Sequence, residues 1–231
     1  MPSTVGLGQP IRNPAIDREL TADLARSTDG ALTLPANLLA QAGLAPGAEV
    51  RCEAGPDGLR LTSDTLRKVY VEVTSACNLA CATCIRRVWD EPVGHMPVGR
   101  FKDLLDGLPD HPITLSLSGF GEPLVHPEFL ALVRLAREWG TGVEVITNGT
   151  LLDTALAVEL VGAGVSRVTV SLDGGDEPAY AAVRGQARSP AVAAVAALVE
   201  ARRRARRPIE IGLAFVAMRR NIRSLPGLLA L

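Results

Sequence analysis

The stretch VYVEVTSACNLACATC, residues 69–84, joins a valine-rich run to a cluster of cysteines. The valine-rich half predicts a β-strand. Cys77, Cys81 and Cys84 follow within eight residues, and the chain has one further cysteine, Cys52. Proteins with parallel α/β sheets build their sites in the loops after the carboxyl ends of the strands. The stretch therefore predicts a thiol-containing site at the end of a first strand.

The same rhythm of strand and helix continues downstream. Apolar runs recur at 113–117, 143–146, 167–172 and 209–216, and helical patterns lie between them at 97–108, 127–140, 152–164 and 189–207. Apolar strands that alternate with amphipathic helices indicate βαβ units and a parallel sheet. We predict an α/β fold with about five strands, which fits either a doubly wound sheet or part of a β/α barrel.

Composition limits the class of protein. The 231 residues are 47% hydrophobic and 21% charged, which is typical of a folded chain with one medium and one small domain. We find no apolar run long enough to span a membrane and no secretory signal, so we expect a cytoplasmic protein without membrane contact.

Positive charge is concentrated near the end of the chain, in EARRRARRP at 200–208. The arginines could form a nucleic-acid patch, or they could lie on the exposed last turn of a helix, where cations suit the helix dipole. Because no aromatic residue interleaves them as a stacking platform would require, we favour the helix end.

Three kinds of site could use the clustered cysteines. A structural zinc ion needs four ligands, and Cys52 or His95 would have to supply the fourth. A buried, inert cysteine is a simple explanation for one of these residues but not for all three. An iron–sulfur cluster usually takes four thiolates, so three would leave one iron open to a ligand that is not protein.

The Cys-x3-Cys-x2-Cys spacing after the first strand resembles the radical S-adenosylmethionine (SAM) enzymes. The resemblance implies that Cys77, Cys81 and Cys84 bind a [4Fe–4S] cluster and that SAM chelates its open iron. It also implies a six-stranded (β/α)6 barrel, of which this chain would hold about five strands.

Later segments resemble the SAM-binding motifs of the same family, in the same order. In SLSGFGEPLVHPEF, the family's Gly-Gly-Glu-Pro segment matches Gly119, Gly121, Glu122 and Pro123, which the resemblance places against the SAM amino group. Alone, this segment could simply be a turn. Asn148 in ITNGT could reach the nucleoside or form an Asx turn.

Two further segments complete the resemblance. Ser171, followed by Asp173, matches a ribose-contacting segment in VTVSLDGG, and Arg184 either pairs with the SAM carboxylate or is a surface arginine. The segment around the last predicted strand carries Phe215, Val216 and Met218. The resemblance implies that apolar residues of this strand pack under the adenine of SAM, but these three could equally be ordinary core residues.

The cysteine loop also departs from the family pattern. Many relatives place an aromatic residue before the last cysteine to contact the adenine, whereas this chain has Thr83, which is not aromatic. Residues 86–96 resemble maturases of tungsten-cofactor oxidoreductases, a subgroup close to the molybdopterin-pathway cyclase and to peptide-modifying enzymes. Trp89 and Asp90 could shape the site, although a packed Trp and a helix-capping Asp are a simpler explanation.

We expect three parts along the chain: an arm at 1–28, a small β-rich domain at 29–62, and a SAM core at 67–231 that is incomplete at its C-terminus. The small domain should contain a strand, a short helix from Pro35, and two strands joined across Pro56-Asp57-Gly58. It resembles the AbrB-type swapped hairpin, in which two chains interlock. Its net negative charge favours dimerisation or partner docking over DNA binding, with Cys52 as a small buried residue.

The leading hypothesis is a radical SAM enzyme that abstracts hydrogen from a peptide or cofactor precursor. The resemblance implies a reductant such as a ferredoxin or flavodoxin. The rival is an AbrB-type DNA-binding regulator with a redox- or metal-sensing cysteine cluster, and a third hypothesis is a chain that binds the cluster without activity. His95 and His111 have no predicted role, and His126 is predicted to begin a helix.

Overall fold

The computed structural model describes residues 66–109, 113–206 and 208–230 in full, together with short segments at 25–26, 32–33, 51–56 and 58–62. Two compact units divide the chain, Met1–Thr65 and Leu66–Leu231. Residues 1–24 and 27–28 of the predicted N-terminal arm, the helix at Pro35, the Cys52 side chain and His111 lie outside the described residues, whereas residues 25–26 of that arm form a strand.

Two antiparallel strand pairs lie in the first unit. The strand β1 (Ala25–Arg26) pairs with β2 (Leu32–Thr33), and β3 (Arg51–Gly55) pairs with β4 (Gly58–Thr62). The second pair closes with Gly55 opposite Gly58, so the two strands meet at the predicted turn. The resemblance to a swapped hairpin stays a prediction.

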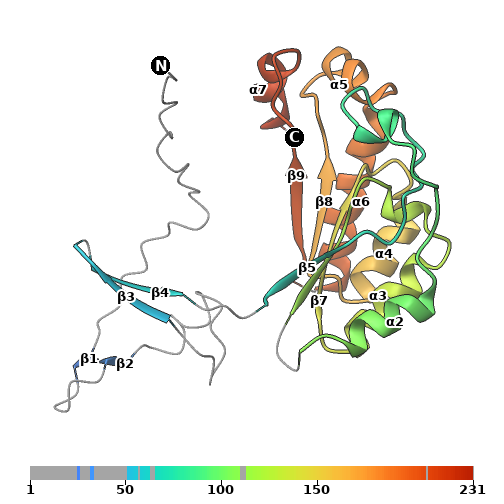
Figure 1. Cartoon of the computed structure of the whole chain (residues 1–231). Helices are drawn as coiled ribbons and strands as arrows, with labels where there is room; N and C mark the ends of the chain where they lie inside the picture. The colour runs from blue at the N-terminus through green and yellow to red at the C-terminus, as the bar shows by residue number, and fades with distance from the viewer. Residues whose placement is uncertain are drawn as a thin grey trace, which may run out of the picture. The chain divides into compact units, whose positions relative to one another are not determined.

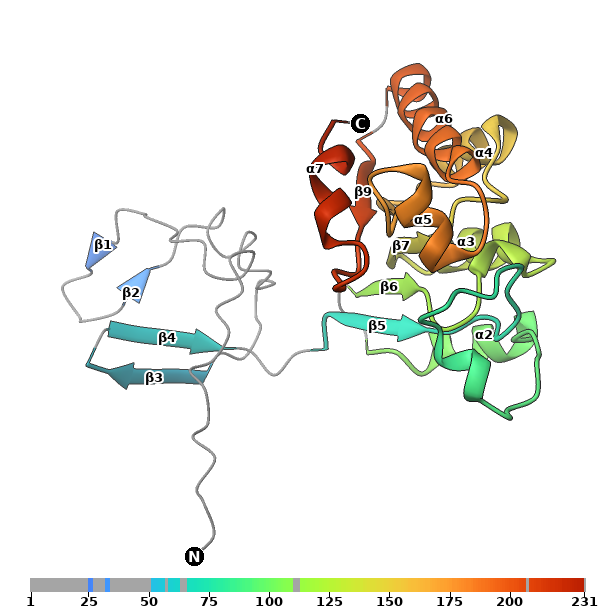
Figure 2. The same cartoon turned by 90° about the horizontal axis from the view of Figure 1, so that it is seen from above.

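A five-stranded parallel sheet forms the centre of the second unit (Figures 1 and 2). Its strands are β5 (Lys68–Val71), β6 (Thr114–Leu117), β7 (Gly142–Thr147), β8 (Arg167–Ser171) and β9 (Glu210–Ala214). They lie side by side in the order of the chain, and every neighbouring pair is parallel. The predicted α/β class and the five strands are confirmed.

One face of this sheet is covered by helices α2 (Val98–Asp106), α3 (Phe129–Glu138), α4 (Thr154–Gly162) and α6 (Ser189–Ala205) (Figure 1). Alternate strand residues such as Leu115, Val145 and Val168 are fully buried against them. The opposite face is more open, and Tyr70 on β5 is 70% exposed there. This alternation directs the polar residues of the strand ends away from the helical layer.

Helix α5 (Glu177–Arg184) was not predicted from the sequence. The Asp176 carboxylate caps its first turn by accepting from the Ala179 N–H, and Pro178 lies in that turn. Gly185 ends it with a φ of 75°, a backbone conformation that glycine adopts without strain. These signals were present in the sequence, and the helix places Arg184 at its last residue.

The arginine-rich segment forms the end of α6. Arg203 and Arg204 both donate to Glu200 one turn earlier, and all three side chains are solvated. The geometry agrees with the predicted exposed helix end. In the described part of the chain, no helix combines the length and the apolar character that crossing a bilayer requires.

Candidate functional site

A cavity of about 330 Å³ opens at the carboxyl ends of the strands. Its walls include the three clustered cysteines and residues from the segments after β6, β7 and β8. Of the residues predicted for the site, those that line this one cavity are Cys77, Cys81, Cys84, Gly119, Gly121, Glu122, Asn148, Ser171 and Arg184. Pro123 does not line it and is the buried first residue of the short helix η2 (Pro123–Val125).

The cysteine loop is held close to the strands by its own contacts. Cys81 is buried and Cys77 and Cys84 are half-buried. The Cys84 N–H donates to the Cys81 carbonyl at 3.1 Å, and the Leu79 N–H donates to the Cys77 sulfur at 3.4 Å. Burial raises the pKa of the Cys77 thiol, and the Leu79 hydrogen bond opposes this only in part. A metal that binds this thiol would therefore displace a proton.

Glu122 joins the loop after β6 to the end of β7. Its carboxylate accepts the Thr147 hydroxyl at 2.6 Å, the Asn148 N–H at 2.6 Å and the Leu124 N–H at 3.1 Å. The residue is 2% exposed, and burial raises the pKa of this carboxyl despite these hydrogen bonds. Much of its acceptor capacity is thus used within the protein, although the residue still lines the cavity.

Glu72, which sequence reasoning missed, organises the glycine loop. Its Oε1 accepts from the N–H groups of Phe120 at 2.5 Å and Gly121 at 3.0 Å. A Cβ on Gly121 would lie 1.9 Å from the Thr74 carbonyl oxygen, so only glycine fits at this approach of two backbones. The sequence could have indicated Glu72, because it directly follows β5 and lies on the side of the sheet away from the helices.

Asn148 connects the cysteine loop to the end of β7. Its amide donates to the Asn78 side chain at 2.9 Å and approaches the Cys77 sulfur at 4.0 Å. Its own Oδ1 accepts from the N–H of Thr150 at 2.9 Å, which is the predicted Asx turn. Asn148 therefore makes the turn and lines the cavity as well.

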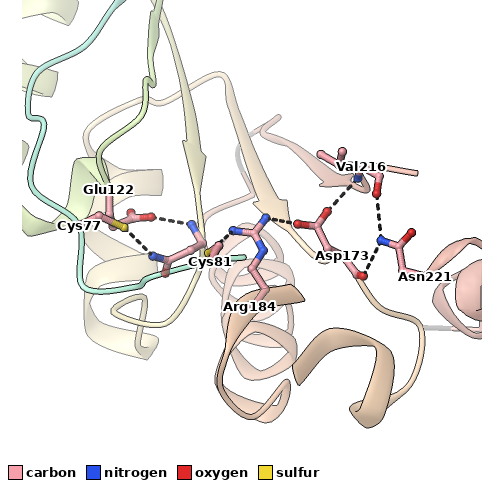
Figure 3. A network of polar contacts seen from close by, with 8 residues as sticks. Cys77, Cys81, Glu122, Asp173, Arg184, Val216 and Asn221 are labelled. Carbon is pink, nitrogen blue, oxygen red and sulfur yellow. Dashed lines mark hydrogen bonds and ion pairs between the residues drawn. The ribbon is translucent and has the colours of Figure 1, made fainter. Parts of the chain in front are cut away.

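Arg184 is a half-buried arginine of the site and not a surface one. Its guanidinium contacts the Asp173 carboxylate at 2.7 Å and the Cys81 sulfur at 3.8 Å (Figure 3). Burial alone would lower the pKa of Arg184, but the charges of Asp173 and Cys81 reverse the sign and raise it. Asn221, also missed from the sequence, donates to the Asp173 and Val216 carbonyls.

The structure decides several smaller alternatives. Phe215 packs against the core, whereas Val216 lines the cavity. Trp89 packs edge to face on Phe120 with ring centroids 4.9 Å apart. The interpretation of Asp90 as a helix cap is wrong, because Asp90 lies in an extended loop and α2 begins later, after Pro97.

His126 lies in the turn before α3 and does not begin the helix, which starts at Phe129, although its carbonyl accepts from the Phe129 N–H at 3.1 Å. Its Nε2 lies 2.9 Å from the Met96 carbonyl and its Nδ1 accepts from the Glu128 N–H at 3.0 Å. The second histidine of this region, His95, lies against Thr74, with Nδ1 and the hydroxyl 2.9 Å apart.

The donor set suits an iron–sulfur cluster. Three thiols line a common cavity, yet among the described residues no three His, Cys, Asp or Glu side chains converge on one ion-sized position. Thiolates that bind separate irons of a cluster need not converge in this way. Beside them, the Nε of Arg184 is buried without a hydrogen-bond partner among the described residues, a donor that an anionic group could satisfy.

Together, the parallel sheet and a thiol-lined cavity at its carboxyl end define an α/β enzyme site that can hold a metal cluster. Residues 71–212 match the model of the Radical SAM superfamily. This match covers more than half of the chain, so the protein belongs to the radical SAM superfamily, a family of enzymes that use a [4Fe–4S] cluster and SAM.

Similar proteins are named for cofactor modification, heme synthesis and mycofactocin maturation. The chain is 36% identical over 110 residues to a tungsten-containing aldehyde ferredoxin oxidoreductase cofactor-modifying protein of Pyrococcus furiosus, covering 47% of this chain and 31% of that protein. It is 32% identical to an AdoMet-dependent heme synthase of Nitratidesulfovibrio vulgaris, covering 57% and 36%. It is 34% identical to the mycofactocin maturase MftC of Mycobacterium ulcerans, covering 49% and 31%. The matched part thus spans about a third of each relative's length.

Solved structures share the fold. The chain aligns with anSMEcpe bound to AdoMet and a Cp18Cys peptide at a TM-score of 0.58 and 21% identity, over 71% of this chain and 47% of that one. It aligns with Streptococcus suis SuiB bound to the precursor peptide SuiA at 0.59 and 14% identity, over 73% and 37%. At this identity the likeness shows the fold.

Proposed function

We propose that this protein is a radical SAM enzyme whose cluster is held by Cys77, Cys81 and Cys84 and whose SAM binds in the adjoining cavity. The observation that supports this most directly is that the three thiols share one cavity with residues from three further strand ends. When bound, the cluster supplies the electron that cleaves SAM reductively, and the resulting radical abstracts hydrogen from substrate.

In this proposal the chain's own residues orient SAM. Gly119 and Gly121 let the backbone approach the methionine half closely, in a loop that Glu72 holds in place. Glu122 offers its carboxyl group at the cavity wall, and Ser171 and Asn148 offer polar groups to the nucleoside. Phe120, on which Trp89 packs, lines the same cavity as Thr83.

The substrate we propose is a peptide or a cofactor precursor that is being matured. Support comes from the relatives, which are named as a cofactor-modifying protein, a heme synthase and a mycofactocin maturase. The proposal includes a ferredoxin or flavodoxin as electron donor, a reducing, cytoplasmic setting and a dimer formed through the first unit.

The test is anaerobic reconstitution of the protein with iron and sulfide, followed by EPR spectroscopy of the reduced protein with and without SAM. A [4Fe–4S]⁺ signal that changes shape when SAM is added is the expected result. Replacement of Cys77, Cys81 or Cys84 by Ala should abolish the signal, because each removes one thiolate ligand.

The matched control is Cys52→Ala, which changes the fourth cysteine of the chain and should leave the signal unchanged. A cluster whose spectrum is blind to SAM, or preferential binding of zinc by the three thiols, would contradict the proposal.

A further inference from the structure

Arg184 lies between a carboxylate and a cluster ligand. Its Nη2 contacts Asp173 Oδ2 at 2.7 Å and its Nη1 lies 3.8 Å from Cys81 Sγ, within hydrogen-bonding distance of a sulfur acceptor (Figure 3). The Arg184 side chain is 14% exposed and that of Asp173 is 3% exposed. Water therefore screens the guanidinium charge only weakly at the sulfur.

Asp173 is itself fixed from the far side. Its Oδ1 accepts the Val216 N–H at 2.8 Å. The Asn221 amide donates to the Asp173 carbonyl at 3.0 Å and to the Val216 carbonyl at 2.9 Å, which ties the segments after β8 and β9 together. One carboxylate oxygen is thus used by the backbone, and the other is directed at Arg184.

A second link fixes the distance between α5 and the cysteine loop. The Ala82 N–H donates to the Val183 carbonyl at 2.8 Å, and these two residues are the chain neighbours of Cys81 and Arg184. This hydrogen bond keeps the backbones of the two segments close together, and the ion pair with Asp173 holds the guanidinium itself.

We propose that Arg184 is a positioning residue that, held by Asp173, donates to the Cys81 thiolate and raises the reduction potential of the bound cluster. This inference rests on the proposed function, and it differs from the pairing with the SAM carboxylate that the sequence resemblance implies. Reduction from [4Fe–4S]²⁺ to [4Fe–4S]⁺ adds one electron to the cluster. A cationic donor at a ligand sulfur favours the more negative state, and hydrogen bonds to the sulfurs are among the factors that set cluster potentials.

The experiment is an EPR-monitored redox titration of the reconstituted full chain in the absence of SAM, with a low-potential chemical one-electron donor. Arg184→Gln should lower the equilibrium constant for reduction of the cluster about tenfold. This corresponds to a decrease of about 59 mV in the midpoint potential of a one-electron couple. Arg184→Lys keeps the charge but cannot bond both partners with a planar fork, so its potential should lie between the two. Arg134→Gln removes the same charge from the exposed pair between Arg134 on α3 and Glu159 on α4 and should leave the potential unchanged.

The outcomes separate this inference from the proposed function. A parent-like potential in Arg184→Gln, combined with a lost spectral response to SAM, would overturn the inference in favour of carboxylate binding. If Arg184→Gln does not bind a cluster, the midpoint potential of Arg184→Lys provides the test. A value equal to that of the parent protein would also overturn the inference. A parent cluster that is blind to SAM would remove the proposed function, yet the comparison of potentials would still decide the role of Arg184.

Discussion

The backbone N–H of Asn148 donates to the buried carboxylate of Glu122 at 2.6 Å, so the loop after β6 and the end of β7 share one acceptor. Asn148 also approaches the Cys77 sulfur, and Glu122 lines the same cavity. The carboxyl group of Glu122 therefore adds a side-chain link, beyond the pairing of β6 with β7, between the two loops that reach the site.

The pKa of Glu122 makes stability depend on pH. Burial raises this pKa above its usual value of 4.5, so the folded chain keeps the proton to higher pH than the unfolded chain. The contribution to stability is full below 4.5 and is lost as pH rises through the raised pKa. Glu122→Gln cannot ionise and should lack this loss. Urea denaturation at a series of pH values should show the free energy of unfolding of the variant rising relative to that of the parent as the pH increases. Parallel dependences of the two free energies on pH would contradict the argument.

Gly121→Ala should be strongly destabilising. The added Cβ would meet the Thr74 carbonyl oxygen at 1.9 Å and the Ala76 carbonyl oxygen at 2.8 Å, and neither backbone group can rotate away. We expect a loss of about 3 kcal/mol in the free energy of unfolding. Gly99→Ala is the control, because its Cβ in α2 meets nothing within 4 Å and should stabilise the helix slightly. Similar denaturation midpoints for both variants would show that the contact is not rigid.

Asn221→Ala should destabilise the segment after β9. Asn221 is 1% exposed, and its side chain serves the Asp173 carbonyl, the Val216 carbonyl and the Met218 N–H. Leaving these groups unpaired should cost about 2 kcal/mol or more. The control is Arg223→Ala, an exposed change in the neighbouring short helix η3 (Ile222–Ser224), which should stay within about 0.5 kcal/mol of the parent. Equal unfolding free energies for the two variants would refute a structural role for Asn221.

Glu72 offers a test of the glycine loop. Glu72→Leu removes the acceptor for the Phe120 and Gly121 N–H groups, whereas Glu72→Gln keeps a carbonyl oxygen there. We expect about tenfold weaker SAM binding in Glu72→Leu, equivalent to about 1.4 kcal/mol, and a much smaller effect in Glu72→Gln. Isothermal titration of the reconstituted protein with SAM measures both, and a loss of the same size in Glu72→Gln would indicate that charge matters instead of the acceptor.

Local pattern was sufficient to predict the sheet and its four covering helices. Strand positions such as Gly142–Thr147 and helix positions such as Ser189–Ala205 differ from the predicted ranges by only a few residues, because periodicity and chain punctuation act locally. Arg184 could be predicted to belong to the site, but not its contacts. Its partners Asp173 and Cys81 come from segments far apart in the sequence, and nothing in the local pattern specifies that pairing.

For the same reason Asn221 and Glu72 were missed. Each is a single polar residue that satisfies backbone groups of another segment, and such a role has no repeating signal in the chain. The short helix α5 was missed despite its cap, its proline and its terminal glycine, because eight residues carry little periodicity.

The sheet is open: within the described residues, β5 and β9 each have a strand on one side only. Hydrogen bonds between neighbouring strands leave the curvature of an open sheet free to vary. The contacts of Arg184 and Val183 with the cysteine loop span from the segment after β8 to the segment after β5. These contacts cross the carboxyl ends of the strands and limit how far the sheet can flatten. The curvature of the sheet, and with it the width of the cavity, therefore depends on contacts between the loops as well as on the hydrogen bonds between strands.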